Sequence, residues 1–141
     1  MFGTPRNPAA NYRNVELETE VASASPHKLI LMLMDGALLS ISRAQGYMAE
    51  NRIAEKGKSI SMAIDIIGNG LKASLNYEAG DVLAERLGAL YDYMCTRLLQ
   101  ANLRNDRAAL DEVARLLGEI KSGWEEIDSD PAVLSANSSK A

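Results

Sequence analysis

The feature that most constrains this fold is a spacing of apolar residues by three and four positions, which recurs in four long segments. In residues 52–75 the spacing joins Ile53, Gly57, Ile60, Ile64, Ile67 and Leu71. In the next segment, which ends at about Arg104, it joins Leu83, Leu87, Leu90, Met94 and Leu98. In the last it joins Leu110, Val113, Leu117, Ile120, Trp124 and Ile127. Such a pattern places apolar side chains along one face of an α-helix, whereas no segment shows the alternation typical of a strand, so we predict no sheet.

The first segment is more apolar than the others and begins at a clear helix-start signal. Ser25 can cap free backbone N–H groups, and Pro26 suits the first helical position because the N–H that it lacks has no helical partner there. The segment runs to about Glu50 and is almost continuously apolar between residues 29 and 39. A helix with so narrow a polar side is mostly surrounded by protein.

Turn signals separate the remaining segments. Residues 76–81 contain Gly80 and are expected to form a turn, and Asn105 and Asp106 can end one helix and cap the next. Short connections between helices of similar length favour antiparallel neighbours. The sequence therefore predicts an all-α fold, an antiparallel up-down four-helix bundle that covers residues 25–127.

The two ends of the chain differ from the helical part in composition. Residues 1–24 are mostly polar and include prolines, and residues 128–141 are rich in serine with few apolar side chains. Such segments bury too little apolar surface to fold alone. We expect a flexible N-terminal arm and a disordered C-terminal tail.

Composition and charge exclude several classes of protein. A net charge of −4 over 141 residues does not provide the concentrated basic surface that nucleic acid or an anionic membrane attracts. No apolar run approaches the roughly 20 residues that span a bilayer, and the N-terminus has no signal-peptide core. A single cysteine cannot form an internal disulfide, which fits a reducing compartment. We therefore expect a cytoplasmic protein without nucleic-acid binding or membrane insertion.

Residues suited to catalysis or metal binding are scarce. His27 is the only histidine and lies in the first turn of the first helix, where we expect it to be exposed and chemically idle. Cys95, the only cysteine, has no histidine to activate it and is expected to be a small core residue. A metal site needs clustered ligands, which these residues do not supply. We predict no catalytic residue, no metal site and no cofactor, and hence no enzyme.

The sequence Gly68-Asn69-Gly70 interrupts the second helix. Each glycine costs a helix roughly 1 kcal/mol relative to alanine, and the strand and lysine of a phosphate-binding loop are absent. The pair indicates either a locally softened helix or a place where another helix closely approaches the backbone, and we favour close approach.

Two helices carry more apolar residues than one stripe requires. Beside the main stripes lie Met62, Ala63 and Ile66 in the second helix and Tyr91, Cys95 and Leu99 in the third. A peripheral helix of a bundle needs only one apolar stripe. A wide core, a homodimer or a groove for a partner helix would each explain the surplus, and composition leaves all three open.

Several segments resemble the FliS family of flagellar export chaperones, in the family's order and over about Tyr12 to Ile127. The segments are Ala24–Leu29 and Met32–Ala37 in the first helix, Ile66–Ala73 at the end of the second, and Leu90–Met94 with Arg97–Asp106 in the third and the turn after it; Tyr12 and Trp124 also match in type and spacing. Together these segments are much more specific than any single motif in the chain.

The resemblance implies a cytoplasmic four-helix bundle that binds the C-terminal segment of flagellin, prevents premature polymerisation and helps to deliver flagellin to the flagellar type III export gate. In the family the bound segment becomes partly helical, and the arm around the tyrosine can cover the cargo groove until it is displaced. No catalytic step and no cofactor are implied. The export gate, an anti-sigma factor and a co-chaperone are further partners that the sequence leaves open.

On this basis we predict a cargo groove on the second and third helices, together with the tyrosine of the arm. The predicted cargo residues are Tyr12, Ile60, Ile64, Ile67, Leu71, Leu87, Leu90, Tyr91 and Met94. For each of the helical residues the alternative is simple packing in the core. The alternative function is a self-associating helical subunit, structural or regulatory, that does not bind flagellin.

Overall fold

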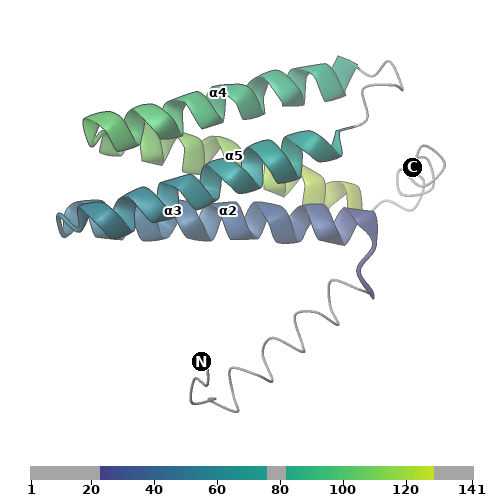
Figure 1. The fold of residues 1–141 in the computed structure, drawn as a ribbon. Helices are drawn as coiled ribbons and strands as arrows, with labels where there is room; N and C mark the ends of the chain where they lie inside the picture. The colour runs from purple at the N-terminus through teal and green to yellow at the C-terminus, as the bar shows by residue number, and fades with distance from the viewer. Residues whose placement is uncertain (1–22, 76–81, 129–141) are drawn as a thin grey trace, which may run out of the picture.

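The computed structural model describes residues 23–75 and 82–128, and every regular element in these two ranges is helical (Figure 1). Its main helices are α2 (Pro26–Ala49), α3 (Ile53–Asp65), α4 (Val82–Arg104) and α5 (Arg107–Asp128). The helix α3 continues into a π-helix, η1 (Ile66–Leu71), and a 3₁₀ turn, η2 (Lys72–Ser74). The predicted all-α fold is confirmed. Most of the predicted arm, the turn that contains Gly80 and the tail lie outside the described residues.

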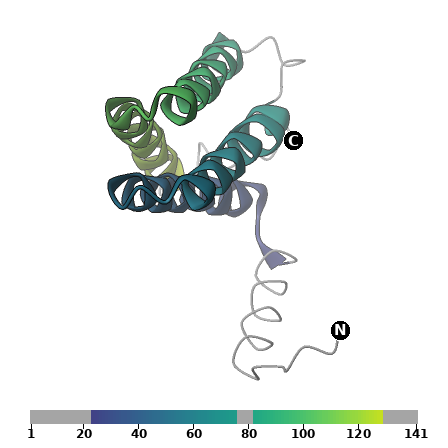
Figure 2. The ribbon, with the colours of Figure 1, turned by 60° about the vertical axis from the view of Figure 1, so that its left-hand side comes forward.

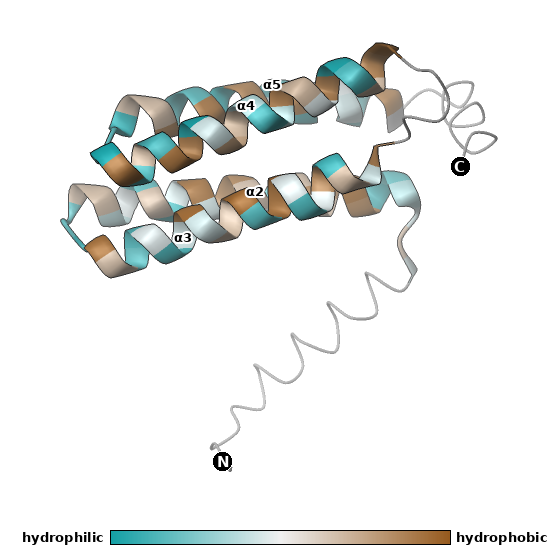
Figure 3. Cartoon of the chain, turned by 45° about the horizontal axis from the view of Figure 1, so that its top comes forward, coloured by the Kyte–Doolittle hydropathy of each residue, from teal (hydrophilic) through white to brown (hydrophobic). Residues whose placement is uncertain are grey.

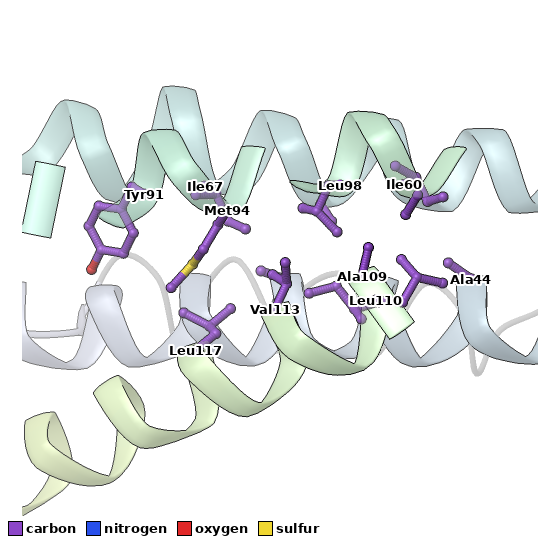
Figure 4. Packing of buried hydrophobic residues seen from close by; sticks show 14 of the residues in the cluster. Ala44, Ile60, Ile67, Tyr91, Met94, Leu98, Ala109, Leu110, Val113 and Leu117 are labelled. Carbon is purple, nitrogen blue, oxygen red and sulfur yellow. The ribbon is translucent and has the colours of Figure 1, made fainter. Parts of the chain in front are cut away.

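Helices that follow one another along the chain lie side by side and antiparallel, and α5 returns to pack against α2 (Figures 1 and 2). The four helices therefore form a closed ring around one core. Each contributes a stripe of side chains that is excluded from water, as Ala44, Ile60, Leu98 and Leu110 show with 0% exposure (Figure 4). This arrangement is the up-down bundle that short connections favour.

The predicted helix caps are present. Ser25 Oγ accepts a hydrogen bond from the backbone N–H of Lys28 at 3.1 Å, next to Pro26 in the first turn of α2. Asp106 Oδ1 accepts one from the backbone N–H of Ala109 at 3.3 Å at the start of α5. Both bonds satisfy N–H groups that have no partner within the helix.

Two asparagines make the tight turns at one end of the bundle. Asn51 after α2 and Asn105 after α4 have φ values of 56° and 54°, a left-handed conformation that asparagine tolerates better than most side chains. The side chain of Lys56 in α3 reaches the turn after α4. There its Nζ donates to the Asn102 carbonyl oxygen at 3.1 Å and to Asn105 Oδ1 at 3.0 Å. Because Lys56 is only 3% exposed, this ammonium group fixes α3 to the end of α4 from within the protein.

The glycines of η1 lie next to side chains of α2 and α4. A Cβ atom on Gly70 would be 3.2 Å from Cδ2 of Leu33 in α2, which is tighter than an ordinary contact. One on Gly68 would be 3.9 Å from Cys95 Sγ in α4. The close approach favoured from the sequence is therefore found at Gly70, whereas the contact at Gly68 is an ordinary one. The backbone also takes the wider π-helical turn at this place, as a locally softened helix would.

The expectation that His27 is exposed is wrong, because its side chain is only 8% exposed. Its Nε2 donates to the Trp124 carbonyl oxygen at 2.7 Å, and Trp124 Nε1 donates to the His27 carbonyl oxygen at 3.1 Å. The two rings stack with centroids 4.8 Å apart and planes 6° from parallel. The last turns of antiparallel α5 cover the first turn of α2, which a local reading of the sequence does not reveal.

We expect Trp124→Phe to lower the free energy of unfolding by about 1 kcal/mol, because it keeps a ring against His27 but removes the indole N–H. Urea denaturation followed by circular dichroism measures the change. The matched control is Tyr47→Phe, which keeps its ring and should change stability by less than about 0.5 kcal/mol. Equal effects of the two variants would contradict a stabilising role for the Trp124 hydrogen bond.

We expect Lys56→Met to lower the free energy of unfolding by roughly 1–3 kcal/mol, because the apolar stem is kept while the Asn102 carbonyl loses its ammonium partner. The exposed neighbour Lys58 provides the control, and Lys58→Met should stay within about 0.5 kcal/mol of wild type. Urea denaturation of the two variants side by side tests this, and a Lys56→Met protein as stable as Lys58→Met would refute the account.

Candidate docking surface

The structure describes every predicted cargo residue except Tyr12, which lies outside the described residues. Five of them line the core and are at most 2% exposed, namely Ile60, Ile67, Leu71, Tyr91 and Met94 (Figure 4 labels four of these). Three are partly buried and pack against that core, namely Ile64, Leu87 and Leu90. Contact between these residues and a cargo stays a prediction.

Large apolar side chains that are exposed lie on other parts of the bundle. Among them are Leu103 (76% exposed) and Leu99 (51%) of α4 and Ile53 (58%) of α3. We call these three residues the α3–α4 strip. Figure 3 shows apolar residues at the start of α3 and at the end of α4, which lie at the same end of the bundle.

Contacts between α3 and α4 show where the strip lies. A Cβ atom on Gly57 would be 3.8 Å from Oδ1 of Asn102, and Cys95 Sγ lies 3.8 Å from the carbonyl oxygen of Ile64. Leu99 is four residues after Cys95 and three before Asn102, so it lies on the same flank of α4, toward α3. Its exposure means that no α3 side chain covers it fully.

The reason lies in the small residues that α3 presents to this flank. Ser61 is four residues after Gly57 and three before Ile64, and therefore lies opposite Leu99. Leu103, one turn further along α4, extends the apolar surface toward the tight turn at Asn105. At this place α3 thus presents small side chains, whereas α4 presents two large aliphatic side chains, Leu99 and Leu103.

An ion pair bounds the strip at its other end. Lys72 Nζ of η2 lies 2.7 Å from Asp92 Oδ1 of α4, and both side chains remain partly exposed. Such a pair contributes little stability, but it places charge at the boundary of the apolar surface. From Asp92 to Leu103 α4 rises about 17 Å, which is the length of roughly three helical turns.

A second exposed apolar surface lies over α2 and α3. A Cβ atom on Gly36 would be 3.5 Å from Ile66 Cδ1, and Leu39 and Met62 lie one turn from these two residues along their helices. Leu39 is 52% exposed and Met62 56%. We call these two residues the α2–α3 patch; it lies on a different face from the α3–α4 strip.

The ionisable groups near the strip offer no reactive centre. Burial raises the pKa of the Cys95 thiol, and the nearby Asp92 carboxylate raises it further, so the thiol stays protonated at neutral pH. Residues 23–75 and 82–128 hold no group of three or more potential metal ligands. In the same ranges no helix is both long and apolar enough to cross a membrane.

Comparison with known families identifies the chain. A family model described as "Flagellar protein FliS" matches residues 8–131. The chain belongs to the FliS family. This confirms the resemblance noted from the sequence, and it identifies the chain as a flagellar secretion chaperone rather than an enzyme.

Three FliS relatives show how far the similarity extends. The flagellar secretion chaperone FliS of Salmonella typhimurium is 50% identical over 116 residues, which cover 82% of this chain and 86% of the relative. FliSB of Pseudomonas aeruginosa is 48% identical over 116 residues (82% and 91%). FliS of Escherichia coli is 46% identical over 123 residues (87% and 90%). The similarity therefore includes all four FliS helices and not a single motif.

Leu103, the most exposed large apolar residue among those described, is not among the predicted cargo residues. Its signal is a spacing of four from Leu99, which itself belongs to the surplus stripe of the third helix. This spacing continues one flank of α4 past the stripe that fills the core.

The environment of Tyr91 gives a pH-dependent test of its place in the FliS core. Burial raises the pKa of its hydroxyl group to about 12, from 10.0 in an exposed tyrosine. Between pH 10 and about pH 12 the hydroxyl group is ionised in the unfolded state but still protonated in the folded state. The free energy of unfolding therefore keeps its full value below pH 10 and falls as the pH rises above it. In Tyr91→Phe we expect the free energy of unfolding to fall by about 2–3 kcal/mol less than in wild type over this alkaline range.

Urea unfolding at neutral pH and between pH 10 and 12 measures the effect in wild type and Tyr91→Phe. Each protein serves as its own reference at neutral pH, so a general cost of the substitution cancels. An equally steep alkaline loss in both proteins would contradict the buried position of this hydroxyl group.

Proposed function

We propose that this chain is a cytoplasmic export chaperone that binds the C-terminal segment of flagellin, prevents its premature polymerisation and helps to deliver it to the flagellar type III export gate. Its FliS relatives are named flagellar secretion chaperones, which supports a secreted flagellar subunit as the cargo. The observation that carries the proposal is the α3–α4 strip, where Ile53, Leu99 and Leu103 are each more than half exposed on a packed bundle.

The surface of the bundle favours a helical form for the bound segment. The backbone N–H and C=O groups of α3 and α4 are bonded within their own helices, so they offer no partners to an extended chain. A segment that loses its water on this surface must therefore pair its own backbone groups. An amphipathic helix does so, and it presents apolar residues three and four positions apart to the strip.

The predicted cargo residues have two roles in this proposal. Ile64, Leu87 and Leu90 are partly buried and remain proposed contacts, while the fully buried residues support the surface from beneath. Tyr12 remains the arm residue proposed to cover the cargo groove. The export gate, an anti-sigma factor and a co-chaperone remain proposed secondary partners without an assigned surface.

We expect Leu103→Ser to weaken binding of the flagellin C-terminal segment roughly tenfold or more, because Leu103 is the most exposed aliphatic side chain of the strip. Met62→Ser is the matched control, since Met62 is exposed by 56% but belongs to the α2–α3 patch. Its affinity should stay within about twofold of wild type. Calorimetric titration measures binding, and circular dichroism verifies that both variants are folded.

The same titrations separate the remaining possibilities. Equal losses in both variants, or no loss in either, would contradict the assignment of the strip. Failure of the folded wild-type chain to bind the flagellin segment would refute the proposed function itself. In that case an oligomer that forms with rising concentration would favour the self-associating subunit.

A further inference from the structure

Two exposed charged residues of α3, Lys58 and Asp65, have no ion pair within residues 23–75 and 82–128. Glu55, the acidic residue nearest to Lys58 in sequence, pairs with Arg52 instead. Asp65 Oδ1 accepts a hydrogen bond from Nδ2 of Asn69 at 2.6 Å, but this amide is neutral and leaves the carboxylate charge uncompensated. Both side chains thus present a net charge to any partner that approaches them.

The charged side chains of α4 along the strip are either matched or turned away from it. Asp92 pairs with Lys72 at 2.7 Å. Arg97 pairs with Glu112 of α5 at 2.6 Å, and Arg104 follows it by seven residues, so both lie on the flank of α4 that faces α5. No other residue of α4 from Asp92 onward is charged. The unmatched charges beside the strip are therefore those of α3.

The spacing of Lys58 and Asp65 places both along the edge of the strip. Ser61, which lies opposite Leu99, is three residues after Lys58 and four before Asp65, so the three share one face of α3. Seven residues correspond to about two helical turns and a rise of about 10 Å. The α3 edge of the apolar surface thus carries one positive and one negative charge, two turns apart.

Contacts with α4 show which end of the strip each charge belongs to. Lys58 directly follows a glycine on which a Cβ atom would be 3.8 Å from Oδ1 of Asn102, and it therefore lies at the Leu103 end. Asp65 directly follows the residue whose carbonyl oxygen is 3.8 Å from Cys95 Sγ, one turn before Leu99 along α4. The strip is therefore positive at the end near Leu103 and negative at the end near Cys95.

We propose that the cargo helix carries an anionic side chain that meets Lys58 and, about two turns away, a cationic side chain that meets Asp65. The inference rests on the proposed function. Apolar contacts are not directional, so an amphipathic helix with apolar spacing of three and four can slide by a turn or reverse on the strip. The dipoles of antiparallel α3 and α4 oppose each other and favour neither direction. Two opposite charges on one edge fix both the register and the direction of the bound helix.

Reversal of each charge tests this pairing. At low salt we expect Lys58→Glu and Asp65→Lys each to weaken binding of the flagellin C-terminal segment roughly three- to tenfold, because a like charge then faces the cargo. At about 1 M salt, where the screening length is about 3 Å, both affinities should come within about twofold of wild type at the same salt. Calorimetric titration at the two salt concentrations measures the effect.

Matched control variants make the same changes in net charge away from the strip. Arg43→Glu alters an exposed residue of α2, and Glu125→Lys alters one of α5, which lies diagonally across the ring from α3. Affinity in both controls should stay within about twofold of wild type at low salt. An effect that came only from the net charge of the chaperone would appear equally in the controls.

The outcomes separate the inference from the proposed function. Wild-type affinity in either reversal variant, a loss that persists at high salt, or tighter binding in one variant with weaker binding in the other would overturn the inference. Absence of wild-type binding would instead refute the function. Should circular dichroism show an unfolded reversal variant, Lys58→Gln and Asp65→Asn decide the question. Each should weaken binding about two- to threefold at low salt only, and unchanged affinity would overturn the inference.

Discussion

The shared core accepts one stripe of side chains from each helix, so Leu98 is fully buried while its neighbour Leu99 is 51% exposed. Successive residues of a helix point about 100° apart, and a helix in a ring of four turns only part of its circumference inward. A second apolar stripe must therefore lie on a flank, where an adjacent helix covers it or leaves it open. On α4 the flank toward α3 stays open because α3 presents Gly57 and Ser61 there.

The helices and their caps could be predicted from the sequence because their causes are local. Apolar spacing by three and four, Ser25 before Pro26, and Asn105 before Asp106 act within a few residues of their own position. The pairing of His27 with Trp124 could not be predicted in this way, because it depends on where antiparallel α5 ends relative to α2. Its two hydrogen bonds join residues from opposite ends of the bundle's sequence.

The candidate site was less predictable for a related reason. Tyr91 and Leu99 belong to the same surplus stripe of α4, yet Tyr91 is 2% exposed and Leu99 is 51% exposed. Each step of four residues advances about 40° around a helix, so Tyr91 and Leu99 point about 80° apart, and periodicity does not show which end of such a stripe faces the core. That choice is made by the rotation of each helix in the ring, and the rotation follows from all four stripes packing together.

The α3–α4 strip is fixed in place before any partner arrives. Lys56 holds α3 to the end of α4 through two hydrogen bonds, and the Cys95 thiol packs beside the carbonyl of Ile64 further along. Such a preformed surface spares a partner the cost of ordering the chaperone. The conformational entropy lost on binding is then almost entirely that of the cargo.

The conformational entropy that the cargo loses limits how tightly the strip alone can hold a segment. Full burial of an aliphatic side chain is worth about 1.5–3 kcal/mol, and those of the strip are already partly covered. Ordering a disordered backbone costs about 1–2 kcal/mol per residue, over the roughly eleven residues that match the strip. A cargo segment must therefore form its own helical hydrogen bonds and bury its own apolar face. Contacts outside the strip, such as the proposed contacts at Leu87 and Leu90, would increase affinity without making any one contact hard to release, as a chaperone that delivers its cargo requires.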